Sequence, residues 1–287
     1  MVSIGRGLRV RKLAAGLAAA GLCASALGLL TINKLRDDDY VSGIRRSLEH
    51  ARGRDGVFTE EMVAGLPEPA RRYFLHAIQP GTPLASRLHW RYSGSLRPNE
   101  RMPWLPLRAD QILVKERGFV WRARAWKGPL LLTASDHYQD GRGRVRIALF
   151  GLIPIINATG SDVSKSALAR LLVEGIALPS MLLPGPHVQI DPVDDTHFAA
   201  KIHLYGETTP VTIAVDSEGQ PREVTLPRWG NATDDQTYRY IPYGATITEG
   251  RTFGGYTIPT RITAGWWYGT ERYQDAIRIS VEWAYIN

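Results

Sequence analysis

One short stretch of the sequence carries three side chains that can exchange protons. Asp136, His137 and Tyr138 follow one another, and a carboxyl, an imidazole and a phenol held together can act as general acid and base or hold a cation. The stretch runs on into Asp140-Gly141, which is ordinary turn chemistry, and Asp136 is equally suited to accepting hydrogen bonds from loop backbone. A turn is the commoner use of such residues, and both interpretations stay open.

A second polar group is embedded in apolar sequence. Arg170 and Glu174 lie one helical turn apart in ALARLLVEGIALPSMLLPG, residues 167–185. An i,i+4 ion pair is favoured when the acid comes first, and here it comes second, so each side chain could instead reach a partner on a strand. The pair is therefore a structural one at the rim of the core, a holder for a ligand headgroup, or a device for proton transfer.

We assign no catalytic residue from these groups, and the candidates are Asp136, His137 and Glu174. The sequence contains no HExxH motif, no GxSxG elbow, no P-loop and no GxGxxG between a strand and a helix. His197 and His203 fall on one side of one strand but lie ~20 Å apart at about 3.3 Å per residue, so they cannot share an ion. We expect no metal and no cofactor, and these absences lean against an enzyme.

Strands must position the candidate residues, because the sequence around them alternates with a period of two. Residues 86–97, 119–125 and 142–149 each place aromatic or aliphatic side chains on one side and arginines on the other. This alternation is typical of an antiparallel sheet with one face in the core. We expect the arginine side to face solvent and to contact an anionic surface through Arg122, Arg124, Arg142, Arg144 and Arg146. A nucleic-acid groove needs aromatic and basic groups on one face, so we expect no nucleic acid.

The stretch at 164–183 is the one strongly helical segment between these strands and those of the second half. A helix that is apolar nearly all round is buried, and a curved sheet covers more of it than a flat one. Ser164 is the expected N-cap, and Pro179 is expected to end or kink the helix. We predict an α+β fold: a strongly curved antiparallel sheet, an open half-barrel of about 9 to 11 strands, wrapped around this helix.

A sheet bent around a helix leaves a slot between the two, and apolar slots bind small hydrophobic ligands. Residues 227–244 form a long irregular stretch with four aromatic residues, which could be a lid over the slot or a packed surface loop. The residues predicted to bind the ligand are Trp90, Trp121, Arg170, Glu174, Trp229 and Tyr243.

The N-terminal segment is predicted to meet a membrane. Four basic residues precede residues 13–32, a run of twenty without a charge, about the length that a helix needs to cross a hydrocarbon core of roughly 30 Å. Ala24-Ser25-Ala26 has the small-x-small form of a signal cleavage site, so a cleavable signal is one alternative, and a buried core helix is another. We prefer an inner-membrane anchor with a cytoplasmic N-terminus and a periplasmic or other extracytoplasmic body.

The composition is that of an ordinary globular protein, with an uneven charge. Residues 1–150 hold 25 Lys and Arg against 13 Asp and Glu, whereas residues 151–287 hold 10 against 15. The single cysteine, Cys23, excludes an intramolecular disulfide and a thiolate metal cluster. We predict three regions: an anchor or signal at 1–36, a helical lead-in at 37–80, and the curved-sheet domain at 81–287.

Several motifs together resemble a bacterial family known only as a domain of unknown function. They are LPEPARRYF, ADQ followed by FVWRARA, DHYQDGRGRV, LARLLVEGIALPSMLL and GGYTIP, and they run in order from Leu66 to the C-terminus. Leu178 departs from the family, which has an aromatic residue before the helix-ending proline, and this bears on the lining of the slot. More loosely, the strands and the VDSEGQPREVTL hairpin are similar to periplasmic lipoprotein carriers, which implies an open half-barrel that accepts acyl chains.

These observations predict a membrane-tethered extracytoplasmic protein that binds a lipid or another amphiphile in the slot between sheet and helix. The protein partner, if there is one, is unknown. The alternatives are an envelope hydrolase that uses Asp136, His137 or Glu174, and a non-enzymatic scaffold for another envelope protein. The basic first half of the chain is where an anionic partner is expected.

Overall fold

The computed structural model describes residues 4–50 and 56–287, without the side chains of residues 4–16, 18 and 19. Its helices are α1 (Ile4–Glu49), α2 (Glu68–Ala77) and α3 (Ser161–Val173), with 3₁₀ turns at Glu60–Met62, Glu174–Ala177 and Pro179–Met181. Its strands are β1 (Arg87–Leu96), β2 (Leu105–Val114), β3 (Gly118–Lys127), β4 (Leu130–Gln139), β5 (Arg142–Leu149), β6 (Ile153–Thr159), β7 (Val188–Pro192), β8 (His197–Leu204), β9 (Glu207–Val215), β10 (Pro221–Gly230), β11 (Arg239–Phe253), β12 (Tyr256–Trp266) and β13 (Gln274–Ile286).

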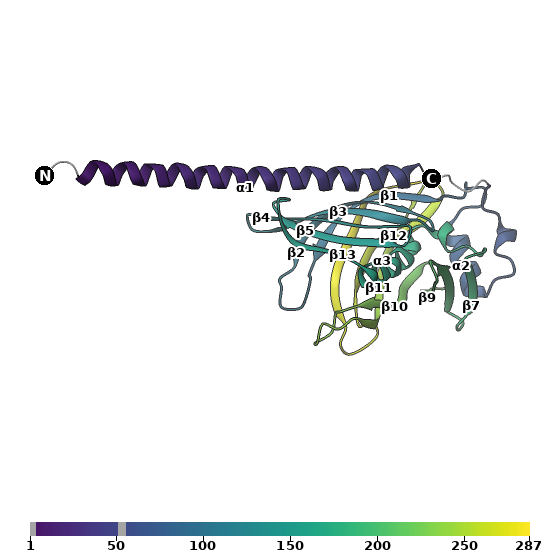
Figure 1. The fold of residues 1–287 in the computed structure, drawn as a ribbon. Coiled ribbons are helices and arrows are strands. Elements are labelled where there is room, and N and C mark those ends of the chain that lie inside the picture. Colours follow the sequence, from purple (N-terminus) through teal and green to yellow (C-terminus); the bar gives the residue numbers. More distant parts are fainter. Residues whose placement is uncertain (1–3, 51–55) are drawn as a thin grey trace.

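All the described strands form one antiparallel sheet of 13 strands, in the order β6-β5-β4-β3-β2-β1-β13-β12-β11-β10-β9-β8-β7. β1 pairs with β13 and thereby joins the two halves of the chain into a single curved surface (Figure 1). The predicted α+β class and antiparallel sheet are confirmed, but the predicted number of strands is too low. β6 is an edge strand exposed on both faces, and the end of β2 is covered on both faces, so neither alternates as a half-buried strand does.

Helix α3 lies in the hollow of the sheet, between the arm that contains β4 and β5 and the arm that contains β9 and β10 (Figure 1). Leu171 and Leu172 are fully buried there, as expected for a helix that is apolar nearly all round. The predicted helix at 164–183 is in fact shorter. Gly160 is the N-cap, while the hydroxyl of Ser164 donates to the Gly160 carbonyl from inside the first turn.

The helix ends before Pro179 for a local reason. A Cβ atom at Gly175 would lie 3.2 Å from the side chain of Leu182, so glycine lets the following 3₁₀ turns fold back closely against the helix end. Glycine is also a poor residue for a helix interior. The buried segment is therefore a helix followed by two tight turns.

Helix α1 is continuous from Ile4 to Glu49, so it runs from the predicted anchor or signal at 1–36 into the predicted helical lead-in at 37–80 without a break. Its last turns pack on the outer face of the sheet, and the rest projects beyond the body (Figure 1). The buried contact consists of Val41, Ile44 and Leu48 from the helix and Ile112, Val114 and Val120 from β2 and β3.

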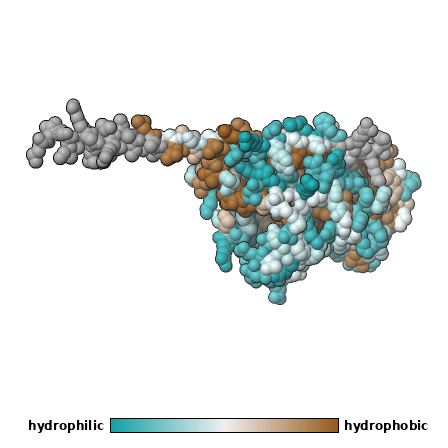
Figure 2. Space-filling model, viewed as in Figure 1, coloured by the Kyte–Doolittle hydropathy of each residue, from teal (hydrophilic) through white to brown (hydrophobic). Residues whose placement is uncertain are grey.

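Within the predicted anchor at 13–32, the side chains of residues 13–16, 18 and 19 are not described. Among the helices of the described part, none combines the length and the apolar character that crossing a membrane requires. The surface of the body is largely polar, with apolar side chains gathered near the place where α1 leaves it (Figure 2).

Contacts between α1 and the outer face of the sheet contradict part of the prediction that the arginine side of the strands faces solvent. The carboxylate of Asp37 on α1 is nearly buried and lies 2.6 Å from the guanidinium of Arg144 and 3.4 Å from that of Arg146. Arg122 donates to the hydroxyl of Ser42 at 2.9 Å. The prediction that these three arginines face solvent is therefore wrong, because the acidic segment continues α1 across them. Arg124 and Arg142 are exposed.

Candidate ligand-binding cavity

A cavity of about 410 Å³ lies between α3 and the inner face of the sheet, at the lower end of the size range of small-molecule sites. Most of its wall is apolar. Its volume is due in part to small residues where the two arms of the sheet face α3: Ala134, Ala245, Ala264 and Ala276. The larger side chains that line it are Trp90, Tyr92, Leu96, Trp121, Val145, Ile147, Val173, Ile176, Val224, Tyr243, Ile247, Ile262, Trp266, Ile277 and Ile279.

Arg170 organises the polar part of the cavity. Its Nε donates to Glu174 Oε1 at 2.8 Å, and its two terminal nitrogens donate to Asp136 Oδ2 at 3.1 Å and to Gln111 Oε1 at 3.4 Å. Gln111 is fully buried and donates in turn to the second oxygen of Glu174. The ion pair between Arg170 and Glu174 thus forms despite its less favourable order, because the strands supply partners for the other hydrogen-bonding atoms of both side chains.

Aromatic rings hold the same guanidinium from the side. The Arg170 Cζ atom lies 4.7 Å from the ring centroid of Phe119 and 4.8 Å from that of Trp121. Trp121 Nε1 donates to the hydroxyl of Tyr92 at 2.5 Å, so the ring is fixed in its turn. A cation that is both ion-paired and flanked by rings has little freedom to turn towards a ligand.

A second guanidinium in the cavity, that of Arg228, is flanked by aromatic rings but has no carboxylate partner among the described residues. Arg228 on β10 places its Cζ atom 4.6 Å from the ring centroid of Tyr243 and 4.8 Å from that of Trp266. Its Nε is buried without a hydrogen-bond partner, and no described carboxylate forms a salt bridge with it. Burial lowers the pKa of Arg228, with the positive charge of Arg170 adding to the effect. An anion inside the cavity would offset both the cost of burying this charge and its repulsion from Arg170.

Asp136 titrates unusually. Burial raises the pKa of Asp136 from 3.8 to about 6, although the charges of Arg170 and Arg228 act in the opposite direction. Between these values the folded protein binds more protons at this carboxyl than the unfolded chain does. Its contribution to the free energy of unfolding is therefore full below pH 3.8 and is lost as the pH rises through about 6.

We expect Asp136→Asn to flatten the pH dependence of stability between about pH 4 and pH 6, where this group changes the free energy of unfolding by up to ~1.4 kcal/mol per pH unit. Urea unfolding at a series of pH values measures it. Asp110→Asn is the control: burial raises the pKa of Asp110, but hydrogen bonds from His89 and Arg45 outweigh it and lower the pKa to about 2. Its effect therefore belongs to a more acidic range, and equal slopes in wild type and Asp136→Asn would contradict the assignment.

The structure brings five of the six predicted ligand residues, Trp229 excepted, to this cavity, together with Asp136. Trp229 lies elsewhere: its Nε1 donates to Asp162 Oδ1 at 2.8 Å, and the Lys165 ammonium lies 4.7 Å from its ring centroid. Val224 and Arg228 both line the cavity from β10, so Trp229 lies on the opposite face of this strand from Arg228. The same alternation could have identified Arg228 from the sequence.

His137 also lies apart from the cavity. It follows Asp136 on β4 and therefore points to the outer face, where its ring centroid is 5.5 Å from that of Tyr40 on α1. Burial, with the charge of Arg144, lowers the pKa of His137 to about 4. The carboxyl and imidazole that are neighbours in sequence are thus separated by the sheet. The described residues contain no group of three or more His, Cys, Asp or Glu side chains that could hold a metal ion.

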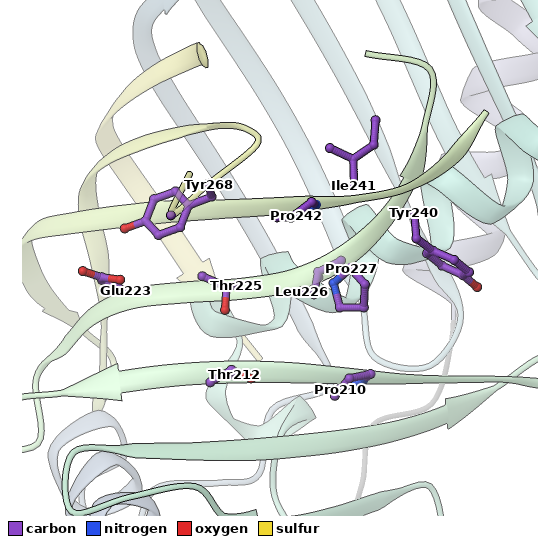
Figure 3. A pocket seen from close by; sticks show the side chains of 11 residues that line it. Pro210, Thr212, Glu223, Thr225, Leu226, Pro227, Tyr240, Ile241, Pro242 and Tyr268 are labelled. Atoms are coloured by element: carbon purple, nitrogen blue, oxygen red, sulfur yellow. The ribbon is translucent and has the colours of Figure 1, made fainter. Parts of the chain in front are cut away.

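Another hollow, of about 610 Å³, lies on β9, β10 and β11 (Figure 3). It is lined by Pro210, Pro227 and Pro242 together with Tyr240 and Tyr268, and Pro227 and Pro242 are paired across the two strands. None of the described residues that line it is basic. The cavity beneath α3 is therefore the better candidate for a site that recognises a charged ligand.

Comparison with known proteins supplies a family and distant structural neighbours. A family model described as a family of unknown function, DUF6544, matches residues 56–276. No curated protein matches the chain. Among solved structures, the chain is similar to a domain from Vibrio parahaemolyticus whose name assigns it to outer membrane lipoprotein sorting, with 9% identity over 79% of this chain and 92% of that one and a TM-score of 0.39.

Two further neighbours are equally distant. A LolA superfamily protein from Nitrosomonas europaea is 8% identical over 76% of this chain and 92% of that chain, with a TM-score of 0.40. A DUF1329 family protein from Desulfovibrio piger is 9% identical over 80% of this chain and 94% of that chain, with a TM-score of 0.33. Scores of this size do not establish a shared fold, so the cavity itself must provide the basis for a function.

Proposed function

The chain belongs to the family of unknown function DUF6544, as its motifs had indicated, and we propose that it binds an amphiphile, a lipid or an acylated molecule, in the cavity beneath α3. One observation carries the proposal: a largely apolar cavity contains the Arg228 guanidinium, which no described carboxylate pairs. The apolar wall suits a hydrocarbon chain. The guanidinium suits a phosphate or carboxylate in the same molecule.

The two arginines of the cavity have different roles in this proposal. Arg170 donates from each of its three nitrogens, to Glu174, Asp136 and Gln111, so it maintains the site. Arg228 is held only by aromatic rings and is free to donate to a ligand. An ion pair with a bound anion would offset the cost of burying this charge.

We also propose that residues 13–32 tether the protein to a membrane, with the body on the extracytoplasmic side. The support is the uncharged run of twenty residues and the basic flank that precedes it. Hydrolysis is not part of the proposal, because Arg170 engages both Asp136 and Glu174 and the imidazole of His137 lies on the other face of the sheet.

The test is direct identification of the ligand. The full chain is extracted from membranes in a mild detergent, and native mass spectrometry followed by lipid extraction identifies what remains bound. We expect an anionic molecule with an acyl chain. A protein that arrives ligand-free and whose melting temperature is unchanged by phospholipids and by a dansyl-labelled fatty acid would overturn the proposal.

Arg228→Gln should weaken binding of the dansyl-labelled fatty acid by about tenfold to a hundredfold, since a hydrogen bond to a charged group contributes ~1.5–3 kcal/mol. Fluorescence titration measures it. The matched control is Arg222→Gln on the same strand, whose exposed side chain pairs with Asp216 at 2.7 Å. Equal weakening of a neutral acylglycerol probe would show that Arg228 shapes the cavity without recognising charge.

A further inference from the structure

The apolar inner face of the sheet continues beyond the cavity to an exposed edge. Ala134 and Ile147, which line the cavity, are paired across β4 and β5, and Ile147 is paired with Ile156 on the edge strand β6. The neighbouring row of apolar residues is also paired across these strands and runs from Leu132 through Leu149 to Ile153 on β6. Paired residues share a face of the sheet, so an unbroken apolar surface leads from the cavity wall to β6.

This surface ends in a cluster of exposed hydrophobic side chains, which we call the apolar tip. Their exposed fractions range from 41% to 58%, although all are large. Figure 2 shows apolar surface on the body near the place where α1 leaves it. Contiguous exposed patches of this kind mark interaction surfaces. The apolar tip consists of Leu130, Phe150, Ile153, Ile155 and Ile156.

The cavity reaches the same end of the sheet. Leu96, the last residue of β1, lines the cavity, and so does Pro98, which is exposed. In this antiparallel arrangement the ends of β1, β3 and β5 lie together, and the β5–β6 connection carries Phe150. The exposed lining and the apolar tip are therefore on one end of the body.

Helix α1 crosses the outer face at this end. A Cβ atom at Gly151 would lie 3.3 Å from the Lys34 side chain, and Phe150 and Lys34 line one groove between α1 and the sheet. Lys34 is two residues from the end of the proposed anchor, or ~3 Å along the helix. A bilayer entered by α1 would therefore meet the apolar tip.

That groove is lined by six basic and four acidic side chains, and two of the basic ones fit an anionic surface. Arg108 on β2 and Arg124 on β3 are directly paired across the sheet, both are exposed, and neither forms a salt bridge with a described carboxylate. Like charges directly opposite each other are unfavourable. Lipid phosphates at the ends of these side chains would neutralise both.

We propose that the apolar tip inserts into the lipid bilayer beside α1, so that the cavity opens at the membrane surface and receives its amphiphile directly from the bilayer. This inference rests on the proposed function for the route of the ligand. The contact itself is separate from ligand binding: it needs the apolar tip, the two arginines and the proposed membrane anchor in α1.

Depth-dependent quenching tests the contact. In a Cys23→Ser background, Ile155→Cys carries an environment-sensitive fluorophore, and Val193→Cys, a similarly exposed apolar position beyond β7, carries the same label as a control. The full chain is placed in phosphatidylcholine and phosphatidylglycerol vesicles that contain brominated acyl chains. We expect quenching at position 155 and none at position 193.

Equal quenching at the two positions, or no quenching at position 155, would overturn the proposal. So would shielding of the label at position 155 that depends on protein concentration without vesicles, since that would assign the apolar tip to a second copy of the chain. Circular dichroism melting of each labelled protein shows whether the fold is retained.

A second variant tests the route of the ligand. Ile156→Asp should slow transfer of the dansyl-labelled fatty acid from vesicles about tenfold, the factor for losing burial of one isoleucine side chain. Binding of the same probe from solution should be unchanged. Quenching at position 155 in a protein that binds no probe from solution would overturn the proposed function and still support the membrane contact.

Discussion

Replacing Arg170 by methionine is expected to lower the free energy of unfolding by about 3–5 kcal/mol at neutral pH, the cost of breaking a buried ion pair from one side. The substitution removes the partner of Glu174, Asp136 and Gln111 at once and leaves their oxygens in an apolar cavity. Methionine fills a similar space, so the decrease in the free energy of unfolding reflects lost electrostatic interactions more than lost packing. Urea unfolding followed by tryptophan fluorescence measures it.

The control and a second variant separate charge from volume. Arg222→Met removes an exposed ion pair from β10 and should cost less than ~1 kcal/mol. Adding Asp136→Asn to Arg170→Met should recover part of the loss, because one uncompensated carboxylate disappears. A loss below 1 kcal/mol for Arg170→Met, or no recovery in the double variant, would show that water reaches the cluster and that Arg170 is available to a ligand.

This result would also show which of the two cavity arginines is needed for folding and which can be tested for ligand recognition. If Arg170 is needed for folding, its loss from the protein says nothing about recognition, and only Arg228 can be tested as a ligand group.

The alternation of side chains predicted the inner face of the sheet well. Trp90 and Trp121 follow from their period of two, and the cavity contains both. Tyr243 was predicted within an irregular stretch, and it reaches the cavity from β11. A helix that is apolar nearly all round had to be enclosed, and α3 is enclosed by both arms of the sheet. Local periodicity is enough for such predictions because alternate residues of a strand point to opposite faces, so the pattern within each strand identifies its buried face.

Contacts between distant segments were harder to predict. Arg144 and Arg146 look solvent-facing within β5, and only the docking of α1 reveals that Asp37 covers them. The partners of Arg170 come from β2 and β4, and no spacing in the sequence links Gln111 to Glu174. The choice of Trp229 over Arg228 has another cause: residues 227–244 were interpreted as an irregular stretch, whereas both residues lie on β10, where neighbouring side chains point to opposite faces.

The size of the cavity also escaped prediction, because it depends on small residues meeting across the sheet. Ala245 and Ala264 are directly paired on β11 and β12, and both line the cavity. Alanine in a strand looks unremarkable in the sequence, and the pairing becomes visible only once the register is known. These alanines are therefore the best places at which to close the cavity without touching its charges.

Ala264→Phe is expected to abolish binding of the dansyl-labelled fatty acid, with a loss of at least about a hundredfold in affinity, while the protein stays folded. The ring would occupy the space in which we place the acyl chain, and filling a cavity commonly leaves stability equal or slightly higher. Fluorescence titration measures the affinity, and thermal unfolding shows that the fold is retained.

Thr263→Phe is the matched control, since it adds the same ring one residue away on the opposite face of β12. It should bind the fatty acid as wild type does. Undiminished binding by Ala264→Phe would place the ligand outside the cavity beneath α3, with the hollow on β9, β10 and β11 as the next site to examine. Loss of binding in both variants would instead point to an effect of the added ring on the sheet, and Ala245→Phe would then decide between the two, because it closes the cavity from the neighbouring strand.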